Sequence, residues 1–167
     1  MARQLKVLGI DCGSALVGWG VVSQSGNKFE HYGYGALRTS KGDDTELRLK
    51  DLYEQMLEVV DRTAPDVMAV ESVFFFRNQT TIIPVAQARG VILLAGAVKG
   101  VPVTHYTPPQ VKSAVTGYGK ADKTQVQRMV KQILGLNEIP KPDDVADALA
   151  VAICHLQTAP FLAKIQS

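Results

Sequence analysis

The stretch LKVLGID at residues 5–11 decides the fold expected of this chain, because it is an apolar strand that ends in an acid. Gly13 and Ser14 follow it and mark a turn. A second stretch of the same kind, DVMAVE at residues 66–71, is apolar enough to be covered on both faces. Functional groups gather at the carboxyl ends of parallel strands in an open α/β sheet. If these two strands are parallel neighbours, Asp11 and Glu71 share one edge of the sheet.

The other segments predict a single α/β domain. Two strands, 17–23 and 28–38, flank turn residues and form a hairpin. The remaining pattern predicts a helix that starts at Asp44 or Thr45 and ends before Pro65, a strand at 101–106, and helices at 81–99, 108–115, 122–135 and 142–157. Pro84 is expected in the first turn of its helix. The expected fold class is therefore α/β, with helices flanking a mixed five-stranded sheet of three antiparallel and then two parallel strands. Residues 1–167 form one domain, in which 158–167 is a short tail without a strong pattern.

Composition is ordinary, but charge is unevenly distributed. Of the 167 residues, 46% are hydrophobic and 20% charged, as in soluble globular proteins, and the net charge is only +2. Residues 99–141, however, carry seven basic residues against two acidic ones. This excess suits a polyanionic partner, although a solvated helix face rich in lysine would look the same.

The cysteines and apolar segments indicate a cytoplasmic protein that does not enter a membrane. Cys12 and Cys154 fit neither a metal-ligand spacing nor a disulfide framework, which suits a reducing compartment. The N-terminus lacks the long apolar segment of a secretory signal. The longest apolar stretch, 91–98, is too short to span a bilayer.

Four carboxylates predict a metal site. Asp144 and Asp147 are three residues apart at the start of the last predicted helix, so they project from one face. Apolar residues beside them dock that helix on the sheet and aim the two acids toward Asp11 and Glu71. Oxygen ligands select hard cations such as Mg²⁺ or Mn²⁺, and two such ions can drive phosphodiester hydrolysis. Each acid alone has another interpretation, as the cap of a loop or of a helix.

Six motifs keep a constant order from about residue 5 to residue 157. They are Gly9-Ile10-Asp11-x-Gly13-Ser14, Glu71-x-Val73-Phe74 followed by Asn78, Gln87-Ala88-Arg89-Gly90-Val91, Gln110-Val111-Lys112, Gly117-x-Gly119-x-Ala121-x-Lys123-x-Gln125-Val126, and Asp144-x-x-Asp147-Ala148-Leu149-Ala150. In this series the chain resembles the RuvC-type Holliday junction resolvases, crossover junction endodeoxyribonucleases with a ribonuclease H-like fold. The first motif recurs in other proteins of that fold, whereas the whole series is highly specific.

The resemblance implies roles for the matching residues. It makes the four acids the catalytic metal ligands and places Lys112 and Lys123 near the scissile phosphate, where a compact cation suits developing charge. It makes Phe74 the aromatic residue that stacks on a base at the junction centre, worth roughly 1–3 kcal/mol. We expect Phe75 in the core and leave Phe76 undecided. The DNA-contacting residues expected besides Phe74 are Arg77 and Lys120.

The resemblance also implies a reaction and partners. The expected enzyme resolves four-way junctions in homologous recombination and DNA repair by paired symmetric nicks that leave 5′-phosphate and 3′-hydroxyl ends, with a preference for a short thymine-containing sequence. It uses two Mg²⁺ ions per active site, with Mn²⁺ as a substitute. It forms a homodimer through the helix around Arg89-Gly90 and works with a branch-migration helicase complex of the RuvA and RuvB type. Cys12 departs from the family pattern, in which proline is common. His31, His105 and His155 match no ligand position and are expected to be structural, with Trp19 in the core.

Other functions remain as alternatives. A sugar-kinase or actin-like ATPase also begins its phosphate loop with GIDxG, but its nucleotide lies between two lobes and this chain has length for one. A structure-specific DNA-binding protein without catalysis would not need all four acids. A more distant ribonuclease H-like nuclease would differ by substrate, cutting RNA–DNA hybrids rather than branched DNA.

Overall fold

The computed structural model of the chain describes residues 3–72 and 79–166, and within these ranges the elements follow the predicted order. The strands are β1 (Lys6–Cys12), β2 (Leu16–Ser25), β3 (Lys28–Arg38), β4 (Val67–Glu71) and β5 (Val103–Tyr106). The helices are α1 (Thr45–Thr63), α2 (Gln79–Val98), α3 (Pro108–Thr116), α4 (Lys123–Leu134) and α5 (Asp143–Gln166).

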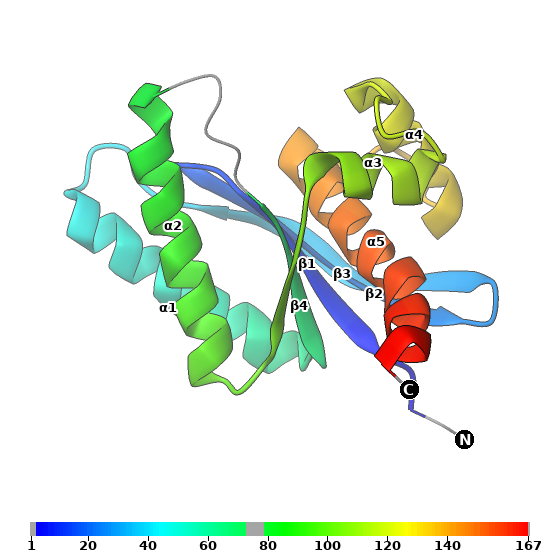
Figure 1. Cartoon of the computed structure of the whole chain (residues 1–167). Coiled ribbons are helices and arrows are strands. Elements are labelled where there is room, and N and C mark those ends of the chain that lie inside the picture. The colour runs from blue at the N-terminus through cyan, green and yellow to red at the C-terminus, as the bar shows by residue number, and fades with distance from the viewer. Residues whose placement is uncertain (1–2, 73–78, 167) are drawn as a thin grey trace.

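The five strands form one mixed sheet in the order β3-β2-β1-β4-β5 (Figure 1). β2 pairs antiparallel with both β1 and β3, whereas β4 pairs parallel with both β1 and β5. The prediction of three antiparallel and then two parallel strands is therefore confirmed. β1 is central, and its Val7, Leu8 and Ile10 side chains are fully buried.

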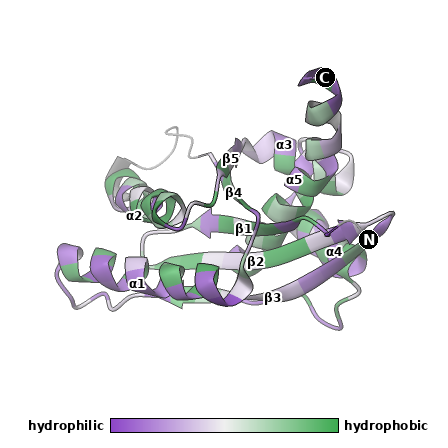
Figure 2. Cartoon of the chain, turned by 90° about the horizontal axis from the view of Figure 1, so that it is seen from below, coloured by the Kyte–Doolittle hydropathy of each residue, from purple (hydrophilic) through white to green (hydrophobic). Residues whose placement is uncertain are grey.

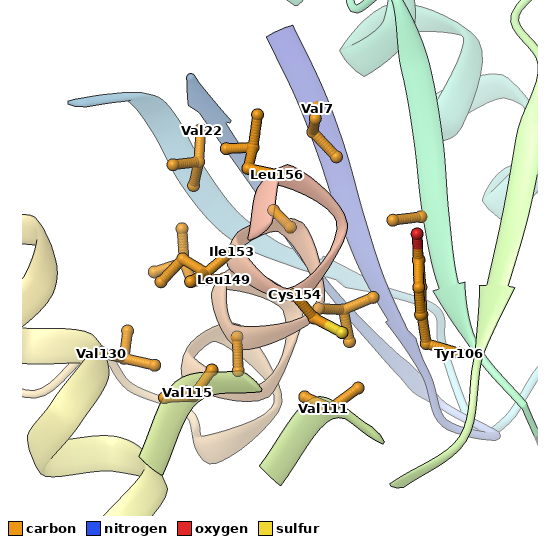
Figure 3. Packing of buried hydrophobic residues seen from close by; sticks show 14 of the residues in the cluster. Val7, Val22, Tyr106, Val111, Val115, Val130, Leu149, Ile153, Cys154 and Leu156 are labelled. Atoms are coloured by element: carbon orange, nitrogen blue, oxygen red, sulfur yellow. The ribbon is translucent and has the colours of Figure 1, made fainter. Parts of the chain in front are cut away.

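Helices cover both faces of this sheet (Figure 1). α1 and α2 lie on one face, over a core that includes Leu8 and Met68. α5 packs on the other face, where its Leu149 and Ile153 join a second core. Figure 3 shows α5 between the sheet and the side chains that α3 and α4 contribute, such as Val115. Figure 2 shows that the edge strand β3 is mostly hydrophilic, while α1 alternates between hydrophilic and hydrophobic segments, as a helix with one buried face does.

Two glycines bring the backbone of α5 against the sheet. A β-carbon on Gly18 of β2 would collide with the backbone of Asp144, and one on Gly9 of β1 would collide with the backbone of Ala148. Gly18 is also the cross-strand partner of Asp11. The close approach therefore fixes the first turn of α5 beside the carboxyl end of β1.

Two helix boundaries differ from the sequence prediction, and a proline is the reason in each. α2 begins at Gln79, so Pro84 lies inside the helix rather than in its first turn. α5 continues to Gln166 through Pro160 and through most of the segment that was expected to be a tail, 158–167. A proline inside a helix removes one backbone hydrogen bond. In α5 the Thr158 hydroxyl adds a local bond, donating to the Cys154 carbonyl at 2.7 Å.

By length and composition α5 could cross a membrane, but most of it is buried inside the protein. Figure 3 shows it surrounded by side chains of the core. It is the central helix of this domain.

Candidate active site

Two of the predicted acids lie next to each other at one edge of the sheet. β1 and β4 are parallel neighbours, and Ile10 pairs with Val70. Asp11 and Glu71 each follow one of these paired residues, so they lie side by side where both strands end. The expected sharing of one sheet edge is confirmed.

α5 carries the other two acids to the same edge. Asp144 and Asp147 lie in its first turns, and the Asp144 backbone rests against Gly18, the cross-strand partner of Asp11. A side-chain hydrogen bond with Asp144 is one of the interactions that act on the Asp11 carboxyl. β1, β4 and α5, which are remote from one another in sequence, thus place four carboxylates in one neighbourhood.

Burial and mutual repulsion raise the pKa of three of these acids. Burial raises the pKa of Asp11 well above its ordinary value, and the charges of Asp147, Glu71 and Asp144 raise it further. Burial raises the pKa of Glu71 to about 7, with a further contribution from Asp147 that Lys112 opposes. Burial also raises the pKa of Asp147, although Lys123 opposes the effect. Such a cluster is stabilised by bound protons or by cations.

The donor set fits hard divalent cations. All four side chains offer carboxylate oxygens, the ligands that Mg²⁺ and Mn²⁺ prefer. Among the described residues, however, no group of three or more His, Cys, Asp or Glu side chains is already arranged to hold one ion. The four acids therefore lie close enough to raise one another's pKa without forming a closed set of ligands.

The two predicted lysines border the same pocket as two of the acids. A cavity of about 270 Å³ is lined by Glu71 and Asp147 together with Lys112 of α3 and Lys123 of α4. Lys123 Nζ lies 3.7 Å from Asp147 Oδ2. Burial lowers the pKa of Lys123, but Asp147 and Asp143 raise it by more, so the ammonium stays charged at neutral pH.

Side-chain caps fix the starts of α3 and α4, the two helices that carry these lysines. Thr107 and Gln110 form a capping box at the start of α3, and Asp122 and Gln125 form another at the start of α4. The Asp122 carboxylate accepts from the Gln125 N–H at 2.8 Å, which satisfies a free donor of the first turn. Because Lys123 is the first residue of α4, this cap sets its direction toward the pocket.

Asp143 is a fifth acid at this edge, outside the four that the sequence predicted as metal ligands. Its carboxylate lies 3.4 Å from Lys123 Nζ and 3.1 Å from Lys141 Nζ. Asp143 therefore helps to hold Lys123. In the sequence, only the position of Asp143 next to Asp144 indicates that it belongs to the site. The contacts of Asp143 with Lys123 and Lys141 come from the structure alone.

The histidines stay outside the acid cluster, as expected. His155 is buried, with its Nδ1 2.7 Å from the Tyr106 hydroxyl. His105 Nδ1 lies 2.7 Å from Arg89 Nη2, and His31 stands against the ring of Tyr34. Lys120 is exposed in the loop between α3 and α4. Trp19 is buried in the core, as expected.

The aromatic residue expected to stack on a base at the junction centre lies outside the residues that the structure describes. Phe74, Phe75, Phe76 and Arg77 belong to residues 73–78, so the roles expected for them stay predictions from the sequence.

A mixed sheet with two acids at the ends of its central strands, faced by a helix that supplies two more, defines a ribonuclease H-like nuclease. A family model described as crossover junction endodeoxyribonuclease RuvC matches residues 7–155. The crossover junction endodeoxyribonuclease RuvC of Desulforamulus reducens is 56% identical over 151 residues, covering 90% of this chain and 93% of that protein. The chain belongs to the RuvC family of crossover junction endodeoxyribonucleases.

Solved structures agree with this family. The structure of Thermus thermophilus RuvC matches with a TM-score of 0.86 at 38% identity, covering 94% of this chain and 96% of that one. T. thermophilus RuvC in complex with Holliday junction substrate matches with the same score at 37% identity and the same coverage. The expected ribonuclease H-like fold is confirmed, and the family match speaks against the sugar-kinase alternative.

Proposed function

We propose that this protein resolves four-way (Holliday) DNA junctions in homologous recombination and DNA repair by metal-dependent hydrolysis of phosphodiester bonds. The observation that carries the proposal is the meeting of four carboxylates from β1, β4 and α5, where burial and mutual repulsion raise the pKa of Asp11, Glu71 and Asp147. The T. thermophilus relative whose structure contains a Holliday junction substrate supports the choice of substrate. One sheet with its two helix layers accounts for the described elements, so we treat 1–167 as a single nuclease domain.

The proposed metal ligands are Asp11, Glu71, Asp144 and Asp147. We infer two ions per site, Mg²⁺ with Mn²⁺ as a substitute, because four hard oxygen donors and their excess negative charge exceed what one small cation needs. When bound, the two ions activate a water molecule and stabilise the leaving oxygen of the phosphodiester.

The lysines of the pocket act on the phosphate itself. Lys112 and Lys123 face Glu71 and Asp147 across the cavity, where a phosphate between them gains two compact positive charges. The Lys123 contact with Asp143 holds its ammonium at the open edge of the pocket, where the side chain stays 56% exposed. These residues orient the scissile phosphate and stabilise the charge that develops on it. Water attacks the phosphorus and the bond to the 3′ oxygen breaks, which yields 5′-phosphate and 3′-hydroxyl ends.

A homodimer through α2 suits paired nicking, since two related strands must be cut. The buried face of α2, with Ala88, Ile92 and Ala95, packs against the rest of the domain. Its opposite face exposes Ile83 and Leu94, together with Val98. A β-carbon on Gly90 of this exposed face would meet nothing within 4 Å, so a partner helix can approach closely there. Apart from the exposed Gln87, this face is apolar and carries no charge, so it fits a second copy of the same helix.

The remaining assignments come from the resemblance. We propose Phe74 as the wedge at the junction centre, Arg77 and Lys120 as DNA contacts, and a helicase complex of the RuvA and RuvB type as partner. We place the reaction in the cytoplasm, because Cys12 and Cys154 are free thiols that suit a reducing compartment.

Cleavage of synthetic substrates tests the function directly. The protein is incubated with a four-way junction, a linear duplex of the same sequence and an RNA–DNA hybrid, each with Mg²⁺, Mn²⁺ or EDTA. We expect paired symmetric nicks in the junction alone, and only with a metal. Glu71→Gln should abolish cutting, while Glu54→Gln, on the exposed side of α1, serves as the matched control. Equal cutting of the linear duplex would contradict junction specificity, and cutting in EDTA would contradict the metal site.

A further inference from the structure

The turn between β1 and β2 decides where the carboxyl end of β1 lies, and β1 ends one residue after Asp11. The parallel pairing of β1 with β4 stops at Ile10. Beyond that point, in the part of the chain that the structure describes, β1 pairs with β2 alone, and the last pair joins Cys12 to Val17. The position of Asp11 therefore depends on how residues 13–16 close the turn.

Backbone hydrogen bonds close most of this turn. The Gly13 N–H donates to the Leu16 carbonyl at 3.0 Å, and the Thr39 N–H, which follows β3, donates to the Ala15 carbonyl at 3.3 Å. A β-carbon on Gly13 would collide with the Leu16 carbonyl, so the chain reverses within very little space. These bonds use two of the carbonyls of the turn, and the Ser14 carbonyl takes its partner from α1.

Arg48, in the first turn of α1, supplies that partner. Its Nη2 donates to the Ser14 carbonyl at 3.0 Å, and its Nε donates to the Thr39 hydroxyl at 3.4 Å. The planar guanidinium presents its donors in a fixed fork, so one side chain can hold two acceptors in a set geometry. Hydrogen bonds from an ionised donor are also stronger than those between neutral groups. Arg48 thereby links α1 to the turn after β1 and to the residue that follows β3.

No acid competes with these two acceptors for Arg48. Within residues 3–72 and 79–166, no ion pair involves its guanidinium. Arg48 also lines a cavity of about 70 Å³ between α1, α2 and the turn, and the walls of this cavity, which include Thr45 and Gln87, carry no carboxylate. The hold of Arg48 on the turn therefore does not depend on the ionisation of a neighbouring acid.

The acid cluster explains why the end of β1 needs an anchor. The charges of three other acids repel the ionised Asp11 carboxyl. Because the pairing with β4 has already ended, the end of β1 can relieve this repulsion by moving away from the cluster. A turn that is tied to α1 opposes such a movement.

We propose that Arg48 is a positioning residue for Asp11, which holds the turn after this acid and so keeps its carboxylate aligned with the other metal ligands. The proposal rests on the proposed function, since it assigns Arg48 to the same metal site. In this role Arg48 touches neither the metal nor the DNA. Residues that orient metal ligands from outside contribute about 10-fold to 100-fold to metal affinity or activity. Because Arg48 acts through the backbone, we expect an effect near or below the lower end of that range.

Metal binding without DNA tests this role. Arg48→Met and Arg48→Lys form a matched pair, because both keep a long side chain and only lysine keeps a donor for the Ser14 carbonyl. Titration calorimetry measures the affinity for Mn²⁺. Arg48→Met should bind Mn²⁺ about threefold to tenfold more weakly than the wild type, and Arg48→Lys should stay within about twofold of it. Lys50→Met removes an exposed lysine of α1 that pairs with Glu54, and this control should leave the affinity unchanged.

Cutting and DNA binding separate positioning from a direct DNA contact. Single-turnover cutting by Arg48→Met should fall about tenfold at limiting Mg²⁺ and recover at saturating Mg²⁺. Its affinity for the four-way junction in EDTA should match that of the wild type. Weaker junction binding with unchanged Mn²⁺ affinity would make Arg48 a DNA contact and would overturn the proposal.

Hydrogen exchange of the metal-free protein measures the turn itself. Peptides that cover residues 11–17 should exchange faster in Arg48→Met than in Arg48→Lys. Thr39→Val removes the second acceptor of Arg48 and should act in the same direction, whereas Thr39→Ser keeps the hydroxyl and should behave like the wild type. The Thr39 variants test the anchor even if Arg48→Met does not fold.

The outcomes distinguish this proposal from the proposed function. Equal Mn²⁺ affinity in Arg48→Met and Arg48→Lys, or equal exchange of residues 11–17 in Thr39→Val and Thr39→Ser, overturns the positioning role. If the wild type binds Mn²⁺ but cuts junctions no better than linear duplex, the proposed function fails while the difference between the Arg48 variants in Mn²⁺ affinity still supports the anchor.

Discussion

At the scale of single residues, Asp11 shows how catalysis conflicts with stability. Its carboxyl lies beside three other acids and is partly removed from water, so its ionised form is unfavourable in the folded protein. In the unfolded chain the four acids are far apart, so this repulsion is absent. A protein optimised only for stability would not keep this residue ionisable, which makes its presence a sign of function.

We therefore expect Asp11→Asn to abolish junction cutting and yet stabilise the metal-free protein. The amide keeps the shape of the carboxylate and removes one negative charge. For a domain of this size each kcal/mol gained raises the unfolding midpoint by roughly 2–4 °C. Thermal unfolding in EDTA at pH 8 measures the effect, and Asp51→Asn, at an exposed position of α1, is the control. A lower midpoint in Asp11→Asn than in the wild type would show that the acid cluster is not repulsive.

Glu71 gives the metal-free protein a distinct pH dependence. Its pKa is about 7 in the folded protein, against an ordinary value of 4.5. Between these values the folded state binds more protons than the unfolded state, so the free energy of unfolding falls as pH rises from about 4.5 to about 7. Glu71 alone lowers the free energy of unfolding by on the order of 3 kcal/mol over this pH range.

Denaturant unfolding in EDTA between pH 5 and pH 8 checks this expectation. The wild type should lose stability across the range, and Glu71→Gln should flatten much of the slope. Added Mg²⁺ should restore stability at pH 8, because a ligand that binds only the folded state stabilises it. A flat wild-type profile would contradict the raised pKa of Glu71.

At the scale of elements, the position of α5 decides whether four acids become one site. Its first turn lies on Gly18, and further along the helix His155 is tied to Tyr106 at the end of β5. Burial raises the pKa of Tyr106 to about 12, with a further contribution from Cys154, so its hydroxyl keeps its proton and stays hydrogen-bonded to His155 Nδ1 at 2.7 Å. Figure 3 shows Tyr106 on the side of α5 that carries Cys154. The helix is thus fixed at two points along its length.

Gly18→Ala should separate the acids without unfolding the domain. The added β-carbon meets the backbone of Asp144, which cannot yield as a side chain can, so the first turn of α5 must move away from β1. Gly20→Ala on the same strand is the matched control, because its β-carbon meets the side chain of Leu149, Cδ2 and Cγ, rather than backbone. We expect Gly18→Ala to raise the Mg²⁺ concentration needed for half-maximal cutting at least tenfold, and Gly20→Ala to change it much less. Equal metal requirements in the two variants would contradict the role of this contact.

At the scale of the whole molecule, paired nicking requires two active sites in a fixed relation. α2 presents the face described above, apolar and free of charge, on the side of the domain opposite to α5 (Figure 1). Exposed apolar stripes of this kind usually mark an interface. A two-fold axis across α2 would place one pocket on each side of a junction.

Leu94→Glu should convert the proposed dimer to a monomer, since each copy would bring a charge into the apolar contact. Leu47→Glu is the matched control: Leu47 of α1 is 53% exposed and Leu94 of α2 is 54% exposed. Light scattering after size-exclusion chromatography gives the mass of each variant. A monomeric variant should nick junction strands singly and without coupling. Dimers in both variants would rule out this face as the interface.

Much of the fold and the site could be predicted because the signals are local. Apolar runs that end in Asp11 and Glu71 indicated two strands, which the structure shows to be parallel neighbours, and the spacing of Asp144 and Asp147 indicated one helix face. The helix boundaries at Pro84 and Pro160 were wrong, because a proline lowers helix propensity locally while the surrounding turns keep the helix continuous.

The sequence by itself determined the order of the elements, the acids that end two apolar strands and the two acids on one helix face, since each depends on periodicity or on a motif within a short segment. Only the tertiary structure decided which atoms meet: Asp144 against Gly18, Asp143 against Lys123, and Tyr106 against His155. Most of these contacts join residues that are far apart along the chain. Their distances depend on how whole helices pack on the sheet, and packing of that kind leaves no periodic trace in the sequence.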